Sequence, residues 1–229
     1  MDSAKSRETQ VSDSCAASTL DWDFAALTRA QRYKLLVGLV IPRPIALVST
    51  RAASGATNAA PFSFFNVLGD EPPIVIVSIE DRDDGRVKDS ARNITATGEF
   101  VVNLVDEAIV ERMHGCSLDY PPDTSEFDVV GFTAAPSRAV GAPRIAEAPV
   151  SLECVVHTVV PIETRKLFIG RIVWLHARGG LVDPATLRVR TDAYFPVGRL
   201  FANRYAKTRE QFAVEANSYN EEMKRLGRT

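Results

Sequence analysis

The amino-acid sequence predicts a mainly β protein, an antiparallel barrel with a few short helices. Apolar, β-branched runs recur along the chain, and several of them are separated by short turns that suit hairpins. The regular alternation of strand and helix that builds a doubly wound parallel sheet is missing, and no Gly-x-Gly-x-x-Gly pattern follows a strand. An antiparallel barrel fits this pattern best because closure of the sheet removes its exposed edges.

One short helix is predicted near the start of the chain. Residues 1–20 are polar and are expected to form a flexible segment. Thr28 followed by Gln31 has the spacing of a capping box, so a helix is predicted over residues 29–37. Gly38 is expected to close this helix.

Three extended segments follow. Residues 45–50 (IALVST) and residues 58–65 flank a turn that contains Ser-Gly, so the segment 45–63 is predicted to be a hairpin. After a pair of prolines, residues 74–79 (IVIVSI) are apolar and β-branched, which indicates a buried strand. These segments supply the first strands of the barrel.

A helix with one apolar face is predicted over residues 87–97. Its apolar residues recur at helical spacing, namely Val87, Ala91 and Ile94. Gly98 lies just past its end, and the strand 100–105 follows. A short helix is predicted over residues 106–116, and residues 117–127 are predicted to be a polar loop of the kind that often serves function.

Two long antiparallel strands are predicted over residues 150–160 and 166–178, joined by a turn at 161–165. Beyond them, the charged segment 208–226 has few apolar anchors, which indicates a helix on the surface. The chain is therefore expected to comprise the N-terminal segment, one domain over residues 21–207 and a helical tail over residues 208–229.

The charge balance excludes several classes of partner. The formal net charge is −2 over 229 residues, so neither nucleic acid nor an acidic membrane surface is an expected partner. No apolar run is long enough to cross a membrane. The N-terminus also lacks the apolar region of a secretory signal, so a cytoplasmic protein is expected.

No disulfide framework or metal site is expected. The cysteines are far apart and odd in number, which indicates reduced thiols: Cys15, Cys116 and Cys154. The histidines have no ligand spacing: His114, His157 and His176. A hydrolase built from Cys154 and His157 is disfavoured because side chains three positions apart in a strand point to opposite faces.

Four segments could carry chemistry, although each alone also suits an ordinary strand or surface turn. Arg43 is held between two prolines. Residues 58–66 combine aromatic and small residues that would let a planar ligand approach the backbone. Residues 78–90 combine basic and hydroxyl side chains with a helix start, which suits an anion. The fourth segment, 196–200, contains a Gly-Arg pair.

Taken together, these segments resemble a known family. The stretches RPIALVST, NAAPFSFFN, EPPIVIVSI, GRVKDSARNI and GEFVVNLV occur in the order found in flavin reductase-like, FMN-binding split-barrel proteins, which include flavoredoxin-type proteins. The resemblance spans roughly residues 30–205. It implies a Greek-key split β-barrel and a homodimer with FMN at or near the interface.

The resemblance also implies which residues bind FMN. Ser49, Thr50 and residues 58–63 would form the wall beside the flavin ring, and Asn93 would assist the groups that hold the phosphate. The full set of expected cofactor-binding residues is Arg43, Ser49, Thr50, Asn58, Ala59, Ala60, Pro61, Phe62, Ser63, Ser78, Arg82, Lys88, Ser90, Arg199 and Tyr205. Among these, Ser78, Arg82, Lys88 and Ser90 would cradle the phosphate. No catalytic residue is identified, because the flavin itself carries the redox chemistry.

The family implies an NAD(P)H-dependent flavin reductase that passes reduced flavin or electrons to an acceptor, such as a partner oxygenase. The turn after Pro161 reads Ile-Glu-Thr-Arg-Lys, where relatives are expected to carry a Gly-, Asn- or His-containing turn. This difference leaves two alternatives open. One is an FMN-bound oxygenase or reductase that acts directly on a small organic substrate, and the other is a flavin-binding module without turnover.

Overall fold

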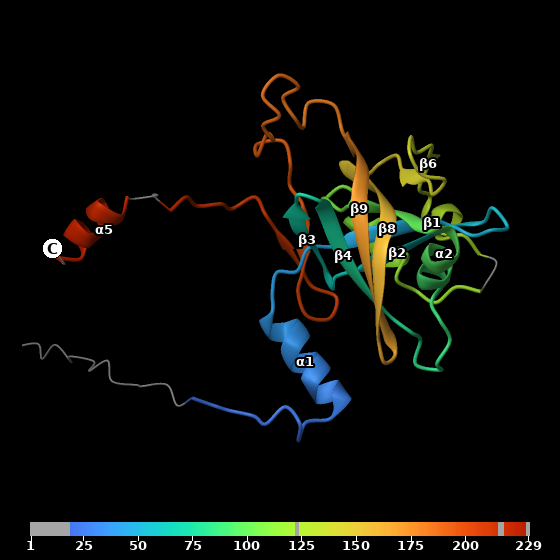
Figure 1. The fold of residues 1–229 in the computed structure, drawn as a ribbon, viewed down its shortest axis with the longest axis horizontal. Coiled ribbons are helices and arrows are strands. Elements are labelled where there is room, and N and C mark those ends of the chain that lie inside the picture. The colour runs from blue at the N-terminus through green and yellow to red at the C-terminus, as the bar shows by residue number, and fades with distance from the viewer. Residues whose placement is uncertain (1–18, 122–123, 215–217, 228–229) are drawn as a thin grey trace, which may run out of the picture.

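The computed structural model describes residues 19–121, 124–214 and 218–227. Seven antiparallel strands form the main sheet, in the order β2-β1-β5-β8-β9-β4-β3 (Figure 1). Their bounds are β1 Ala46–Arg51, β2 Thr57–Phe62, β3 Phe65–Asp70, β4 Pro73–Glu80, β5 Glu99–Leu104, β8 Val150–Ile162 and β9 Arg165–Ala177. Two short ladders lie beside the sheet: β6 Ala134–Ala135 with β7 Arg144–Ile145, and β10 Val197–Arg199 with β11 Tyr205–Lys207. The predicted mainly β, antiparallel fold is confirmed.

Both predicted hairpins are present. β1 pairs with β2 so that Ser49 lies opposite Ala59. β8 pairs with β9 along almost their whole length, and the pairing continues to Ile162 and Arg165. The turn between these long strands is therefore tighter than the predicted 161–165 segment. Glu163 adopts the left-handed conformation that a turn of this kind requires, with φ of 49°.

The sheet closes because its two edge strands are consecutive in the chain. Only Ser63 and Phe64 separate β2 from β3, and these strands stand at opposite ends of the strand order. The N–H of Ser78 in β4 donates to the Phe64 carbonyl at 2.9 Å, so the β3–β4 ladder extends into this link, which we name the seam. The prediction of one extended run over residues 58–65 was therefore wrong, because the chain changes its pairing partner within that run.

Two apolar cores lie on either side of β1. The inner core fills the barrel and contains residues from every strand of the main sheet, with Phe100 and Phe168 fully buried. The outer core contains Leu47 of β1 and residues of the short helices. Because both faces of β1 are covered, its sequence lacks the alternation of a half-buried strand. Gly170 lies against the Phe100 ring, where a Cβ atom would lie 2.5 Å from Cζ.

The helices are short: α1 Arg29–Leu39, α2 Asp89–Thr97, α3 Val110–Gly115, α4 Glu126–Val130 and α5 Tyr219–Arg225. The capping box of Thr28 and Gln31 is confirmed, but α1 continues through Gly38 to Leu39. Gly98 ends α2 in the left-handed conformation, as predicted, with φ of 73°. Val87 lies before α2 and is exposed, whereas Ala91 and Ile94 are buried in the barrel.

Two predicted boundaries near the middle of the chain were wrong. The helix expected over 106–116 begins only at Val110, because the Asp106 carboxylate accepts the Ala108 N–H at 3.1 Å and forms a turn. α4 begins inside the segment predicted as a loop over residues 117–127.

The tail differs from its prediction as well. Residues 208–214 are not helical, and Phe212 is 89% exposed, so no apolar contact supports a helix there. The helix α5 lies farther along, as Figure 1 shows. Of the expected flexible N-terminal segment, residues 1–18 lie outside the described residues. No helix among the described residues is long and apolar enough to cross a membrane.

Candidate functional site

Two adjoining cavities lie beside the barrel. We name them the cradle cavity, of about 1040 Å³, which is lined by Arg29 and by residues within 80–92 and 117–121, and the ring cavity, of about 380 Å³. The ring cavity is lined chiefly by Tyr33, Arg43, Pro61, Phe62, Ser63, Met113, Arg199, Phe201 and Tyr205. Ser117 lines both cavities. Together their volumes suit a ligand with a ring at one end and an anion at the other.

The N-terminus of α2 opens into the cradle cavity. The turn before it forms because the Arg82 N–H donates to the Arg86 carbonyl at 2.8 Å, with Gly85 at φ of 81°. Lys88 is the N-cap residue in an extended conformation, and its side chain makes no capping hydrogen bond. The first N–H groups of the helix therefore remain available as hydrogen-bond donors, and the helix dipole adds positive potential there.

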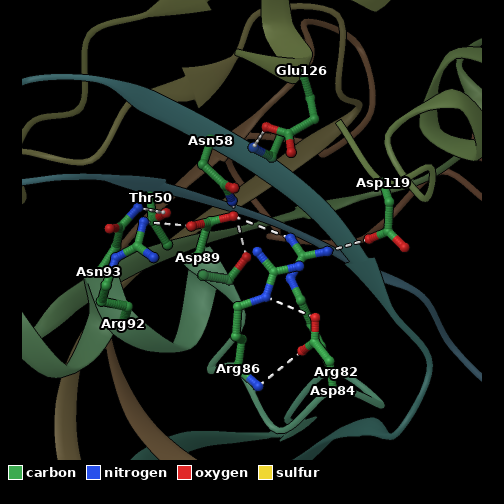
Figure 2. Close-up of polar contacts among 12 residues, drawn as sticks. Thr50, Asn58, Arg82, Asp84, Arg86, Asp89, Arg92, Asn93, Asp119 and Glu126 are labelled. Carbon is green, nitrogen blue, oxygen red and sulfur yellow. Dashed lines mark hydrogen bonds and ion pairs between the residues drawn. The ribbon is translucent and has the colours of Figure 1, made fainter. Parts of the chain in front are cut away.

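Most cations of the cradle cavity are already paired with carboxylates (Figure 2). Arg82 contacts Asp89 at 3.2 Å and also Asp119, and Arg92 contacts the same Asp89. Arg86 contacts Asp84 at 2.7 Å. By contrast, no carboxylate among the described residues lies within ion-pair distance of Lys88. Its ammonium group lies 5.9 Å from the centre of the Phe62 ring, which lines the ring cavity.

A buried polar network fixes α2 against the barrel. The Asn58 side-chain amide donates to Ser90 Oγ at 2.9 Å, and the Asn93 amide donates to Thr50 Oγ1 at 3.0 Å. Figure 2 shows Asn58, Thr50 and Asn93 between the strands and the helix. All four side chains are buried. Thr50, Asn58 and Ser90 are thus placed to orient the helix N-terminus, and in this structure their donors and acceptors are used within the protein.

Seven expected cofactor-binding residues line neither of these two cavities: Ser49, Thr50, Asn58, Ala59, Ala60, Ser78 and Ser90. Ser49 is fully buried, donates to the Pro143 carbonyl at 2.5 Å and accepts from Asn103 at 2.9 Å. Ser78 Oγ accepts from Arg165 Nη1 at 3.2 Å on the β4–β9 face. Ala59 and Ala60 pack in the apolar cores and do not line either cavity. The structure therefore brings Arg82 and Lys88 to the cradle cavity and Arg43, Pro61–Ser63, Arg199 and Tyr205 to the ring cavity.

The two arginines of the ring cavity are paired through their backbones. The Arg43 N–H donates to the Arg199 carbonyl at 3.0 Å, and the Arg199 N–H donates to the Arg43 carbonyl at 2.8 Å. This close approach requires Gly198, where a Cβ atom would lie 2.6 Å from Cβ of Pro42. Burial, the largest cause, lowers the pKa of Arg43; Tyr33 opposes this shift, and the charge of Arg199 adds to it.

Arg43 is 7% exposed, and its side chain donates hydrogen bonds to backbone carbonyls. Its Nη1 atom donates to the carbonyls of Val37 at 2.6 Å and Val40 at 2.9 Å, at the C-terminal end of α1. Its Nη2 atom donates to the Leu200 carbonyl at 3.2 Å. Free carbonyl groups at a helix C-terminus favour a cation, so Arg43 anchors α1 to the barrel.

Two residues near the cavities were not found from the sequence, although neither lines the cradle or the ring cavity: His114 and Glu126. His114 Nδ1 lies 2.9 Å from the Tyr205 hydroxyl, which also accepts from Arg199. Glu126 accepts the N–H of Ala59 at 3.1 Å, on edge strand β2. Burial, the largest cause, raises the pKa of Glu126, and the hydrogen bond from Ala59 opposes that shift. Glu126 begins α4, and an acidic residue after Ser125 was the one available signal.

The remaining candidate chemistries find no support. Cys154 is fully buried, burial raises its pKa to about 12, and His157 on the same strand is exposed. A Cys-His hydrolase at this position is therefore excluded by geometry as well as by the protonation of the thiol. No group of three potential metal ligands occurs among the described residues.

The comparisons with known proteins now decide the family. Residues 38–198 match the model of the flavin reductase-like domain. The chain belongs to this family. It is 42% identical to the uncharacterized protein YwrF of Bacillus subtilis over 194 residues, which covers 82% of this chain and 94% of YwrF. The resemblance found in the sequence is thereby confirmed.

Two solved structures of this flavin reductase-like fold are also similar in sequence. The 2-nitrobenzoate 2-nitroreductase NbaA of Pseudomonas fluorescens is 37% identical, with a TM-score of 0.81 and coverage of 87% of this chain and 98% of NbaA. Component B of nitrilotriacetate monooxygenase from Bacillus cereus is 33% identical, with a TM-score of 0.81 and coverage of 86% and 99%.

A protein with a split-barrel domain from Shewanella frigidimarina confirms the predicted split-barrel fold. It is 22% identical, with a TM-score of 0.71 and coverage of 84% of this chain and 96% of that protein.

Proposed function

We propose that this flavin reductase-like protein is an FMN-dependent oxidoreductase that takes electrons from NAD(P)H and passes them to an acceptor. One observation carries the proposal: Lys88, which has no carboxylate partner among the described residues, lies at the start of α2 in the cradle cavity, and its ammonium group is 5.9 Å from the centre of the Phe62 ring of the ring cavity. A phosphate at the cradle cavity and a planar ring toward Phe62 would match this arrangement of an anion site next to an aromatic wall.

The residues present fit FMN in their donor chemistry. Lys88, Arg82 and the N–H groups of α2 would hold the phosphate, and Phe62 with Pro61 and Ser63 would flank the ring system. Bound flavin would supply hydride and electron transfer. The part of the protein is to bind, to orient and to set the electrostatic environment, and the positive charge of Arg43 would favour an anionic ring.

Two modes of electron delivery are represented among the similar structures. The Bacillus cereus structure is, by its title, one component of a monooxygenase, which supports delivery to a partner oxygenase or other acceptor. The Pseudomonas fluorescens structure is, by its title, a reductase of 2-nitrobenzoate, which supports direct reduction of a small organic substrate. The walled ring cavity of about 380 Å³ favours the second mode, because a substrate could be enclosed there.

We further propose that the protein acts as a cytoplasmic homodimer with FMN at or near the interface. The support is α1, in which Val37 is the buried residue and most of the other side chains are exposed. An isolated helix of 11 residues is marginal in water, so a partner surface would stabilise it.

An absorbance spectrum of the purified protein tests the central proposal. Flavin bands are expected, either at once or after FMN is added, and they should bleach when NADH or NADPH is added without oxygen. Absence of any FMN binding would overturn the proposal. Bands that never bleach would instead identify a binding module without turnover.

The cradle assignment has its own test. Lys88→Ala should weaken FMN binding by about 10- to 100-fold, the value of one charge-assisted hydrogen bond, and should leave riboflavin binding nearly unchanged. Arg82→Ala should act in the same direction. Lys224→Ala, at an exposed position of α5 that lines neither cavity, is the matched control and should change neither affinity. Equal weakening of FMN and riboflavin would show that the phosphate lies elsewhere.

A further inference from the structure

The ring cavity carries a positive charge that nothing in its wall neutralises. Arg43 and Arg199 both line it, and no acidic residue does. Neither guanidinium has a carboxylate within ion-pair distance among the described residues. The neighbouring cradle cavity differs, because its arginines are each matched to an aspartate or glutamate. The excess charge is therefore a local property of the ring cavity.

The backbone forces these two charges together. Residues that exchange both hydrogen bonds across an antiparallel bridge present their side chains to the same face, and like charges opposite each other destabilise such a pair. Gly198 permits the contact and Arg43 is 7% exposed, so the repulsion is not relieved by solvent. The α1 carbonyls bonded to Arg43 offset part of its charge, and Arg199 has no such partner.

Arg199 is the cation that remains open to a ligand. Among the described residues, its side chain makes one hydrogen bond, from Nη1 to the Tyr205 hydroxyl, and it also lies over the Tyr205 ring at 4.9 Å. His114 holds the same hydroxyl at 2.9 Å. The guanidinium is thus fixed in position while its Nε and Nη2 donors are unused, which is the condition for bidentate binding of a carboxylate.

The rest of the wall selects the body of the ligand. Apolar and aromatic side chains complete the cavity: Val37, Ile45, Phe62, Met113, Leu200 and Phe201. A volume of about 380 Å³ lies near the lower end of the range for small-molecule sites and is too small for a dinucleotide. A planar apolar ring with one carboxylate fits both the charge and the wall.

We propose that the ring cavity binds an aromatic carboxylate as the second reactant, with Arg199 as the residue that selects its negative charge. This inference rests on the proposed function, because it assigns the substrate class of the same site. Arg199, held by Tyr205 and His114, would receive the carboxylate. Phe201 would contact the ring of this reactant, whereas Phe62 stays with the flavin, and Arg43 would contribute charge while it anchors α1.

Calorimetric titration with benzoate and with benzamide tests this selectivity. The two probes have the same ring and nearly the same shape, and they differ in charge. The FMN-loaded protein should bind benzoate at least about tenfold more tightly than benzamide. Apo protein is titrated in parallel, so the comparison stands even if FMN does not bind.

Variants assign the selectivity to one side chain. Arg199→Gln should reduce the benzoate-to-benzamide preference to about one, and Arg199→Lys should restore part of it. Arg204→Gln is the matched control, because it removes an exposed arginine from the same segment that does not line the cavity. That variant should keep the preference of the parent protein, and circular dichroism should show that all three variants are folded.

The outcomes separate this inference from the proposed function. No flavin bands would overturn the FMN proposal and leave the benzoate comparison on apo protein intact. Equal affinity for benzoate and benzamide in the parent protein would overturn the inference. So would an unchanged preference in Arg199→Gln, or a loss of FMN affinity in Arg199→Gln as large as the loss of benzoate affinity, since Arg199 would then serve the flavin.

Discussion

Charged side chains in this protein differ in whether the fold pairs them with an opposite charge. Arg82 is held by Asp89 and Asp119, whereas Lys88 has no carboxylate partner among the described residues. The resemblance to the family predicted both as phosphate ligands, and basic residues before a helix start suit an anion. It could not show which cation is already paired, because Asp119 comes from a distant loop.

Glu153 shows a charge that the fold neutralises completely. Its carboxylate is fully buried and accepts N–H groups of Arg138 at 2.8 Å and Ala139 at 2.6 Å, with His176 Nε2 at 2.5 Å. Burial, the largest cause, acts to raise the pKa of Glu153, and these hydrogen bonds together outweigh it and lower the pKa. The carboxylate thereby fixes the loop that precedes β7.

Glu153→Gln is expected to lower the free energy of unfolding by about 1–3 kcal/mol at neutral pH, because the amide replaces a carboxylate among several donors. The folded pKa lies below the unfolded value of about 4.3, so the carboxylate stabilises the fold above that pH. This contribution is lost as the pH falls through the folded pKa.

Urea unfolding at pH 7 and along a series from pH 5 to pH 3 measures both effects. The parent protein should lose stability more steeply in acid than Glu153→Gln does. The exposed Glu210→Gln serves as control and should follow the parent curve. If Glu153→Gln follows the parent curve at every pH, the hydrogen-bonded carboxylate does not contribute as described.

At the scale of elements, the sequence predicted most strands and the helix α2. It did not predict which strands pair with each other or in which register. Apolar, β-branched runs with turn residues between them identify a hairpin, so β1–β2 and β8–β9 were predictable. A change of pairing partner between β2 and β3 leaves no such pattern. Ser49 was assigned to the flavin wall for a related reason: its buried contact with Asn103 depends on the register between β1 and β5.

The docking of β10 against Pro42 and Arg43 gives a prediction for this scale. Gly198→Ala would place a Cβ atom 2.6 Å from Cβ of Pro42, so the two segments must separate. The free energy of unfolding should fall by about 1–3 kcal/mol, as in other overpacked sites. Chemical denaturation measures this loss, and benzoate binding at the ring cavity should weaken in parallel.

Gly179→Ala is the matched control for this change. A Cβ atom at Gly179 would have no neighbour within 4 Å, so stability should stay equal or rise slightly. If the Gly198→Ala and Gly179→Ala proteins have the same free energy of unfolding, then β10 and Pro42 can separate without loss of stability, and the prediction is wrong.

At the scale of the whole molecule, the barrel buries its apolar core, whereas α1 leaves most of its side chains exposed. Figure 1 shows the helix to one side of the barrel, and several of its apolar side chains are exposed. Leu39 is 74% exposed at its C-terminal end, next to exposed Val40. The closed barrel could be predicted from composition and turns, whereas the proposed pairing of α1 with a second copy depends on contacts between chains that one sequence does not show.

Leu39→Glu is expected to shift the protein from dimer to monomer, because a charge would be buried in an apolar interface. Sedimentation velocity over a range of protein concentrations measures the shift. Leu187→Glu is the matched control, since Leu187 is 76% exposed in a loop far from α1 in sequence, and it should leave the assembly unchanged. A parent protein that sediments as a monomer throughout would contradict the proposed homodimer.

The seam of the barrel has a consequence for the energetics of the site. Ser63 lies in the short link that closes the sheet, and it also lines the ring cavity, as do Phe62 and Pro61 just before it. A ligand that binds only the closed form stabilises that form by about 2.7 kcal/mol at a concentration of 100 times its Kd. Binding of the proposed ligand at these residues would therefore couple occupancy to folding, and the cellular supply of that ligand would set how long each molecule survives proteolysis.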